Sequence, residues 1–172
     1  ESKEAGITYL SELGELFRVV LSEDQDFLHP LKKELQIINQ YLRLEKLRFG
    51  KRFEYNIDTP TTLSRGILVP KLFIQSFVHN AIKHAIEPQK KDGQLSIKFI
   101  ENENSIEISI QDNGPGFHNK SKLSSNNTGQ GIQIAEQTIE WINSRSKEKA
   151  AFSIIDLSNY SDERGTRIEI SL

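Results

Sequence analysis

The sequence contains no cysteine and no methionine among its 172 residues. The absence of cysteine excludes disulfides, thiolate zinc sites and thiol nucleophiles, and it fits a reducing compartment. No apolar run approaches the roughly 18 residues that a membrane-spanning helix needs, and no signal peptide is visible. Because the chain lacks methionine and begins at Glu1, we expect it to be a processed product or a fragment of a longer protein.

The chain also lacks an excess of charge of either sign. The 22 Lys and Arg residues nearly balance the 24 Asp and Glu residues, which leaves a formal net charge of -2. No block of like charge is longer than a few residues, so nothing indicates a nucleic-acid-binding face. The hydrophobic fraction of 36% and the charged fraction of 27% are typical of a globular protein. The length suits one sizeable domain, or one domain with an appended element.

Helical periodicity dominates the first third of the chain. Leucines recur at helical spacing across residues 7–21, although Gly14 weakens the pattern. Pro30 is well placed in the first turn of a second helix, which we predict over residues 31–49 and which Gly50 ends. Two helices joined by a short turn suggest an antiparallel hairpin or a helix that packs on a partner chain.

After Gly50 the apolar period changes to two, which predicts strands. We predict strands near residues 53–57, 93–100, 105–111, 151–157 and 167–172, and further helices over residues 72–86 and 131–144. A polar, glycine-rich loop covers residues 112–130. This order predicts an α+β fold: a two-layer sandwich in which helices cover one face of a mixed or antiparallel sheet. The N-terminal helices precede this sandwich in the chain.

The stretch Leu72 to Ile86 is the most apolar helix of the chain, and its remaining polar residues form one narrow stripe. The stripe consists of Ser76, Asn80, Lys83 and His84. An amide, an ammonium and an imidazole are costly on a buried helix unless they line a cleft. The alternative interpretation is an ordinary core helix whose polar seam faces water.

The segment Asp112-Asn113-Gly114-Pro115-Gly116-Phe117 directly follows a predicted strand. Gly114 and Gly116 allow the backbone to approach a ligand where a Cβ atom would clash. At the end of the strand, the Asp112 carboxylate could accept a hydrogen bond from an exocyclic amine. The alternative is a plain hairpin turn, because Asp-Asn-Gly is a good turn sequence.

Two further glycine elements follow. Gly129 and Gly131 close the polar loop and open the next predicted helix, where free backbone N–H groups can bind an anion. Gly165 and Thr166 precede the last strand, and this pair is otherwise a simple turn. Each element alone is a weak signal.

Taken together, these elements resemble the N box, G1 box, G2 box and terminal Gly-Thr of the GHKL ATPase superfamily. More narrowly, LEKLRFGKRFEYNID followed by VPKLFIQSFVHNAIKHAI looks like the catalytic region of the LytS/YehU-type sensor histidine kinases. The resemblance runs from about Leu31 to the C-terminus. It implies a Bergerat ATP-binding fold and, as cofactors, ATP and Mg²⁺.

The resemblance also implies roles for individual residues. Asn80 would ligate Mg²⁺, a hard cation that prefers oxygen ligands, and Asp112 would accept the adenine amino group with support from Thr166. Lys83 and His84 would face the phosphates or the ribose, and Gly114 and Gly116 would form the floor of the adenine pocket. Residues 117–130 would be the ATP lid, with Gly129 and Gly131 closing over the phosphates.

The sequence departs from this family at two points. The residue before the metal-binding asparagine is commonly Glu, whereas here it is His79. A neutral imidazole could still accept a proton near pH 7. The catalytic candidates are therefore His79, as the proton acceptor, and Lys83, which would face the phosphates or the ribose. The acceptor histidine of the family lies in a PHFLFN-like segment that this chain lacks. We interpret His29 as a loop residue, and we expect the chain to bind ATP without autophosphorylating.

We therefore expect an N-terminal helical segment over residues 1–49 and an ATP-binding catalytic domain over residues 50–172. The expected function is that of a sensor histidine kinase, usually dimeric, whose phosphoryl group passes to a response regulator of the LytTR type. A degenerate nucleotide-binding or protein-interaction module is the alternative, and a GHKL hydrolase is a weaker one. We expect a cytoplasmic domain of a bacterial inner-membrane protein whose membrane segment lies outside this chain.

Overall fold

The computed structural model describes residues 6–7, 9–14, 16, 26–60, 66–89, 92–102, 105–116, 128–147, 149–160 and 164–172. Within the predicted helix 7–21, the described residues from 6 to 16 are helical, and Leu16 packs against the core. The rest of that helix, the loop residues 61–65 and the lid residues 117–127 lie outside the described residues.

Helix α2, Leu31–Phe49, has the predicted bounds, and it follows Pro30 and ends at Gly50, whose φ is 62°. Its buried apolar residues recur every three or four positions, so one face enters the core. The helix predicted over residues 72–86 begins one residue later: α3 is Phe73–Ala81 and continues as the π-helix η2, Ile82–Ile86.

Five strands form the predicted mixed sheet, in the order β2-β4-β5-β7-β6. They are β2 (Phe53–Asp58), β4 (Gly93–Glu101), β5 (Ile106–Asp112), β6 (Ala151–Asp156) and β7 (Thr166–Ser171). Strand β2 runs parallel to β4, and the other three pairings are antiparallel. In β4, residues alternate strictly between buried and exposed, because one face meets the helices and the other meets solvent.

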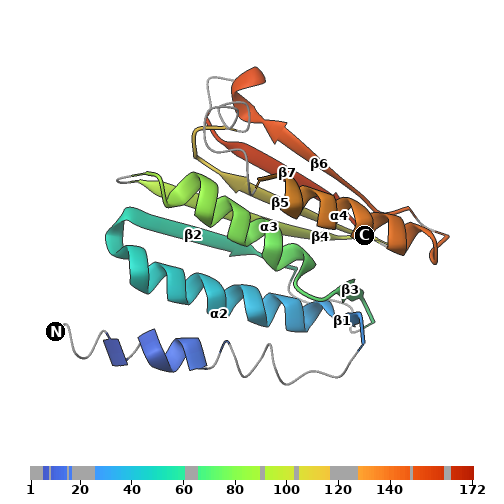
Figure 1. Cartoon of the computed structure of the whole chain (residues 1–172), viewed down its shortest axis with the longest axis horizontal. Helices are drawn as coiled ribbons and strands as arrows, with labels where there is room; N and C mark the ends of the chain where they lie inside the picture. Colours follow the sequence, from blue (N-terminus) through green and yellow to red (C-terminus); the bar gives the residue numbers. More distant parts are fainter. Residues whose placement is uncertain are drawn as a thin grey trace.

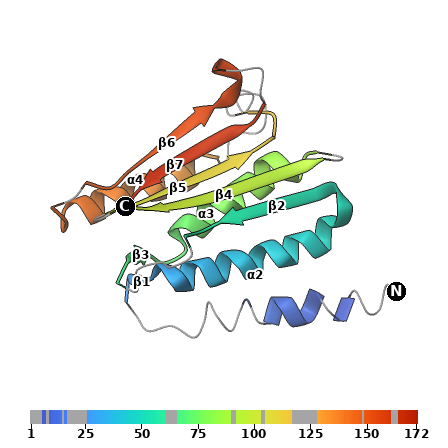
Figure 2. The ribbon, with the colours of Figure 1, turned by 180° about the vertical axis from the view of Figure 1, so that it is seen from behind.

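The sandwich has two layers. Helices α2, α3 and α4 (Thr128–Asn143) lie on one face of the sheet (Figure 1), and none of the described helices covers the opposite face, which Figure 2 shows from behind. The core between the layers contains Ile38 and Leu42 of α2, Ile74 and Val78 of α3, and the inward residues of the strands. The predicted α+β fold, with helices on one face, is therefore confirmed.

A small second sheet was not predicted. Strand β1 (Leu28–Pro30) pairs antiparallel with β3 (Leu68–Pro70), and this pairing brings the segment before α2 to the start of α3. The interpretation of His29 as a loop residue is wrong, because His29 lies in β1, is 4% exposed, and bonds through Nε2 to Glu34 at 2.7 Å.

Glu34 joins α2 to α3. Its carboxylate is fully buried and accepts hydrogen bonds from the backbone N–H groups of Leu72, at 3.0 Å, and Gln75, at 2.9 Å. These are orphan donors at the start of α3, where Leu72 adopts a left-handed conformation and no side chain of its own turn serves as a cap. The position of α3 is thus fixed by a side chain of α2.

Candidate functional site

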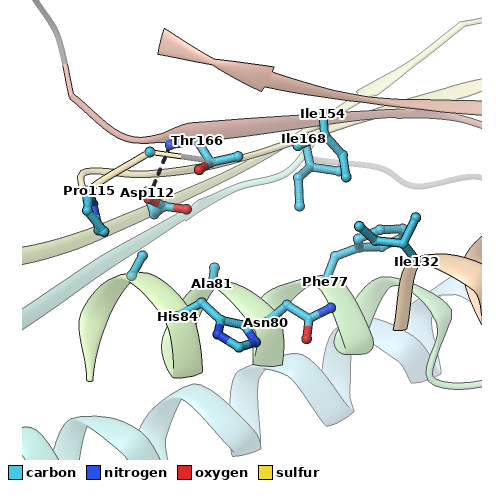
Figure 3. A pocket seen from close by; sticks show the side chains of 12 residues that line it. Phe77, Asn80, Ala81, His84, Asp112, Pro115, Ile132, Ile154, Thr166 and Ile168 are labelled. Atoms are coloured by element: carbon cyan, nitrogen blue, oxygen red, sulfur yellow. Dashed lines mark hydrogen bonds between the residues drawn. The ribbon is translucent and has the colours of Figure 1, made fainter. Parts of the chain in front are cut away.

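A cleft opens between the α3–η2 helix and the ends of the strands that face it. The residues around it come from α3 and η2, from the loop after β5, from the first part of α4 and from β6 and β7 (Figure 3). They are Phe77, Asn80, Ala81, His84, Ala85, Asp112, Pro115, Gly116, Ile132, Ile154, Thr166 and Ile168. The cleft therefore gathers five of the ten predicted site residues: Asn80, His84, Asp112, Gly116 and Thr166.

Asp112 is a buried carboxylate of the cleft with two backbone hydrogen bonds. It is 6% exposed, and its Oδ1 atom accepts a hydrogen bond from the backbone N–H of Gly114 at 2.8 Å. The same atom accepts the backbone N–H of Thr166 at 3.2 Å, the bond drawn in Figure 3. These two donors orient the carboxylate and offset the cost of burying it. The loop after β5 and the start of β7 are thus joined at one carboxylate oxygen.

Two glycines allow this arrangement. A Cβ atom at Gly114 would lie 2.4 Å from Cβ of Ala85 on η2, and one at Gly165, whose φ is +127°, would lie 1.8 Å from the carbonyl oxygen of Asp112. Neither space admits a side chain. The Gly-Thr pair before the last strand therefore brings two strands into contact instead of serving as an ordinary turn.

Asn113 holds the same loop from the opposite side. Its Oδ1 atom accepts the backbone N–H of Gln94 at 2.8 Å, and its Nδ2 atom donates to the carbonyl of Asp92 at 2.6 Å. Gln89, which follows η2, donates to Asn113 Oδ1 at 3.2 Å. The position of Asp112 is consequently supported by the start of β4 and by the end of the central helix.

The metal and phosphate candidates Asn80 and His84 come from the helix across the cleft from Asp112 (Figure 3). A Cβ atom at Gly131 would lie 3.4 Å from Asn80 Nδ2, so α4 approaches the central helix closely at this glycine. The backbone of Gly129 lies in the first turn of α4, which begins at Thr128, earlier than predicted. Gly129 and Gly131, which we expect to close over the phosphates, thus both belong to α4.

His79 and Lys83 lie on the neighbouring stripe of the helix and are not among the residues that line the cleft. The Nδ1 atom of His79 lies 3.0 Å from the Tyr41 hydroxyl of α2. Burial lowers the pKa of His79, and the Lys83 ammonium lowers it further. At neutral pH the imidazole is therefore uncharged, and its catalytic role stays a prediction.

Several cleft residues gave no signal in the sequence. Phe77, Ile132, Ile154 and Ile168 form an apolar wall from four separate elements, and each of them fits an ordinary helix or strand pattern. Tyr41 lies 38 positions from its partner His79. Only the spacing of Phe77 and Asn80, which are three positions apart on one helix, could have suggested that these two residues share a face.

The donor set fits a purine nucleotide. The carboxylate of Asp112 is aligned by two N–H donors and can accept a hydrogen bond from an amine. The apolar wall suits a flat ring, and Asn80 offers an amide oxygen of the kind that binds Mg²⁺. Among the described residues, no group of three or more His, Cys, Asp or Glu side chains could hold a metal by itself. A Mg²⁺ ion that keeps waters and phosphate oxygens needs only one or two protein ligands.

Two family models match the chain. The model described as histidine kinase-, DNA gyrase B- and HSP90-like ATPase matches residues 70–172, and the one described as histidine kinase matches residues 1–53. Within the described residues, no helix is long and apolar enough to cross a membrane.

Relatives with curated names match the C-terminal region. The sensor protein LytS of Staphylococcus saprophyticus is 37% identical over 108 residues, which are 63% of this chain and 18% of that protein. The sensor histidine kinase/phosphatase LytS of Staphylococcus aureus is 38% identical over 109 residues, again 63% of this chain and 18% of the relative. The chain thus matches less than a fifth of the length of these relatives.

Solved structures show the same fold at low identity. The catalytic domain of the histidine kinase ThkA matches with a TM-score of 0.59 and 13% identity. The match covers 84% of this chain and 96% of the ThkA chain. The mycobacterial sensor histidine kinase MprB matches with a TM-score of 0.57 and 17% identity, with coverages of 84% and 95%. The fold is that of a histidine kinase catalytic domain.

Proposed function

Because this chain belongs to the histidine kinase-, DNA gyrase B- and HSP90-like ATPase family, we propose that its cleft binds ATP with Mg²⁺. We further propose that it is the catalytic portion of a sensor histidine kinase, in which the γ-phosphoryl group passes to a histidine outside this chain and then to a response regulator of the LytTR type. One observation carries the proposal: Asp112 Oδ1 is held by the N–H groups of Gly114 and Thr166 at the edge of a cleft that Asn80 also lines.

Separate groups of residues bind the base and the phosphates of the nucleotide. Asp112 accepts the adenine amino group, and Thr166, whose backbone already orients this carboxylate, supports it. The glycines at 114 and 116 let the loop form the floor under the base. Phosphoryl transfer depends mainly on positioning and on charge stabilisation, so a rigid base pocket contributes by fixing where the phosphates lie.

The phosphate end belongs to the central helix and to α4. Asn80 holds Mg²⁺, which neutralises phosphate charge when bound. His84 and Lys83 orient the phosphates or the ribose, and Gly129 and Gly131 supply close backbone approach at the start of α4. His79 remains the proposed proton acceptor in place of the usual glutamate.

The proposal extends to the whole protein. We propose that residues 1–49 are the end of the dimerisation and histidine-containing region with its connector, and that residues 50–172 carry the catalytic site. The full protein would be a homodimer anchored in the bacterial inner membrane, with this region in the cytoplasm. The names of the relatives, sensor histidine kinases, support this reading.

Calorimetric titration of the chain with a non-hydrolysable ATP analogue, with and without Mg²⁺, tests the proposal. We expect Asp112→Asn to weaken binding about tenfold or more, because the amide presents a donor to the adenine amine, whereas Asp58→Asn at an exposed strand end should leave binding unchanged. Asn80→Ala should abolish the Mg²⁺ dependence. Equal affinity of Asp112→Asn and the unaltered chain would overturn the pocket assignment.

A degenerate module that binds nucleotide without transferring phosphate is the second candidate, and His79 favours it because the family usually has glutamate there. A longer chain that includes the upstream histidine distinguishes the two. Incorporation of radiolabelled phosphate from ATP with Mg²⁺ supports the kinase, and binding without incorporation supports the module.

A further inference from the structure

Asp156 is a buried carboxylate close to the cleft to which the proposed mechanism gives no role. It ends strand β6 and is 5% exposed. Its Oδ1 atom accepts hydrogen bonds from the backbone N–H of Ser158, at 3.1 Å, and from the Ser158 hydroxyl, at 2.6 Å. Burying a charge this deeply is costly, so its position requires an explanation.

The carboxylate lies directly behind Gly116, which lines the cleft. A Cβ atom at Gly116 would lie 2.9 Å from Asp156 Oδ1 and 3.0 Å from Oδ2. The space that a side chain at position 116 would need is therefore filled by this carboxylate. Gly116 also has a φ of +84°, which glycine adopts readily and other residues rarely do.

Asp156 also completes a closed arrangement of three segments at this end of the cleft. The loop after β5 contacts the start of β7, where Thr166 donates to Asp112. The start of β7 contacts the end of β6 through the hydrogen bond from Leu157 N–H to the Gly165 carbonyl, at 3.1 Å. The contact of Asp156 with Gly116 joins the end of β6 back to the loop.

Two buried carboxylates, Asp112 and Asp156, thus flank the same glycine-rich loop. In the register of the sheet, Asp156 pairs with Thr166, the residue whose N–H orients Asp112. A negative charge behind the pocket floor favours a base edge that donates hydrogen bonds and disfavours one that presents a carbonyl oxygen, and the low dielectric of a buried site strengthens the effect.

We propose that Asp156 is a positioning residue for nucleobase recognition, which fixes the Gly116 floor and strengthens the preference for a 6-aminopurine over a 6-oxopurine. The inference rests on the proposed function, since it concerns the same pocket. Asp156 acts through Gly116 and through its charge, without contact with the base.

The test compares ATP with inosine triphosphate, which differs from it in carrying a carbonyl in place of the 6-amino group. Calorimetry with both nucleotides and Mg²⁺ gives a ratio of dissociation constants for the unaltered chain and for Asp156→Asn, which keeps the shape of the side chain and removes its charge. We expect the dissociation constant for inosine triphosphate divided by that for ATP to be about threefold to tenfold smaller in Asp156→Asn than in the unaltered chain. A variant that weakens both nucleotides equally, or neither, overturns the proposal.

A second variant covers the case in which Asp156→Asn does not fold. Ser158→Ala removes the hydroxyl donor to Asp156 Oδ1 at an exposed position, so it loosens the carboxylate and leaves its charge in place. We expect the same ratio of dissociation constants to fall in this variant too, but by less than in Asp156→Asn. An unchanged ratio counts against the proposal. If the unaltered chain binds neither nucleotide, the proposed function fails instead, so the two failures are distinct.

Discussion

The ring of Phe27 packs against the indole of Trp141, with the ring centroids 4.1 Å apart. Phe27 immediately precedes β1, and its carbonyl accepts the backbone N–H of Lys71 at 3.1 Å. Trp141 lies near the end of α4, and the Arg145 guanidinium lies 4.3 Å from the centre of its ring. The segment before β1 is therefore tied to α4, the helix that carries Gly129 and Gly131.

Because the chain has one tryptophan, this contact can be followed by fluorescence. Phe27→Ala should expose the indole, shift its emission to longer wavelength and lower the free energy of unfolding by about 1 kcal/mol. Tyr160→Ala, at a side chain that is 80% exposed, is the control and should change neither quantity when Trp141 is excited selectively. An unshifted spectrum for Phe27→Ala would contradict the packing.

Glu34→Gln should lower the free energy of unfolding by about 2–4 kcal/mol, because the fully buried carboxylate bonds to His29 and to two N–H groups of α3. The matched control is Glu54→Gln. The Glu54 side chain is 70% exposed and pairs with Lys46, so its loss should cost about 0.5 kcal/mol or less. Urea denaturation of both variants measures the difference, and equal losses would refute the structural role of Glu34.

Gly165→Ala should be one of the most damaging single-methyl additions in the chain. Its Cβ would lie 1.8 Å from the Asp112 carbonyl oxygen, and its φ is +127°, so we expect a loss of about 3 kcal/mol or more. Gly50 also has a positive φ, of 62°, but no atom lies within 4 Å of the position of its Cβ. Gly50→Ala should therefore cost less, about 1–2 kcal/mol, because it meets backbone strain but no steric clash. Thermal denaturation that ranks the two variants in reverse would be inconsistent with the packing described.

The pH dependence of stability should include a contribution from His79. Burial first, and then the Lys83 charge, lowers its pKa below the ordinary 6.5, so the unfolded chain binds this proton more tightly than the folded protein does. The stabilising contribution is complete above pH 6.5 and is lost as the pH falls from 6.5 to the lower folded pKa.

An NMR titration of the imidazole C–H signals, assigned with His79→Gln, measures this pKa directly. Lys83→Gln should raise the pKa of His79 toward its ordinary value, because it removes a neighbouring positive charge. Lys98→Gln, on the opposite face of the sheet, should leave it unchanged. A His79 pKa that does not respond to the charge at position 83 would refute the assigned cause.

Local periodicity predicted the larger elements well. The alternation at Phe53, Tyr55 and Ile57 and the four-residue repeat of the central helix each report burial on one face, which is a local property. Strands β1 and β3 were not predicted, because three residues are too few to show a period and because their pairing joins positions about forty residues apart. Asp112 and Asn80 could be selected from the resemblance, because their loops carry distinctive glycines.

Contacts between distant side chains could not be read from the sequence. Nothing near Glu34 indicates that it caps another helix, since its partners Leu72 and Gln75 are 38 and 41 positions away. Asp156 was missed for a related reason: it ends an ordinary strand, and only the fold places it behind Gly116. Sequence patterns reveal which face of an element is buried, whereas the pairing of these polar groups depends on how the elements assemble.

The π-helix at Ile82–Ile86 is equivalent to one extra residue inserted into an α-helix. The bond from Glu87 N–H to the Ile82 carbonyl, at 2.8 Å, spans five positions instead of four, so the residues after it are displaced along and around the helix. A relative that lacks this insertion would have a different residue than His84 at the same place in the cleft. Alignment of such relatives by sequence alone would therefore misassign the ligand contacts of this turn, and a one-residue deletion within it would change the cleft without removing any of its side-chain types.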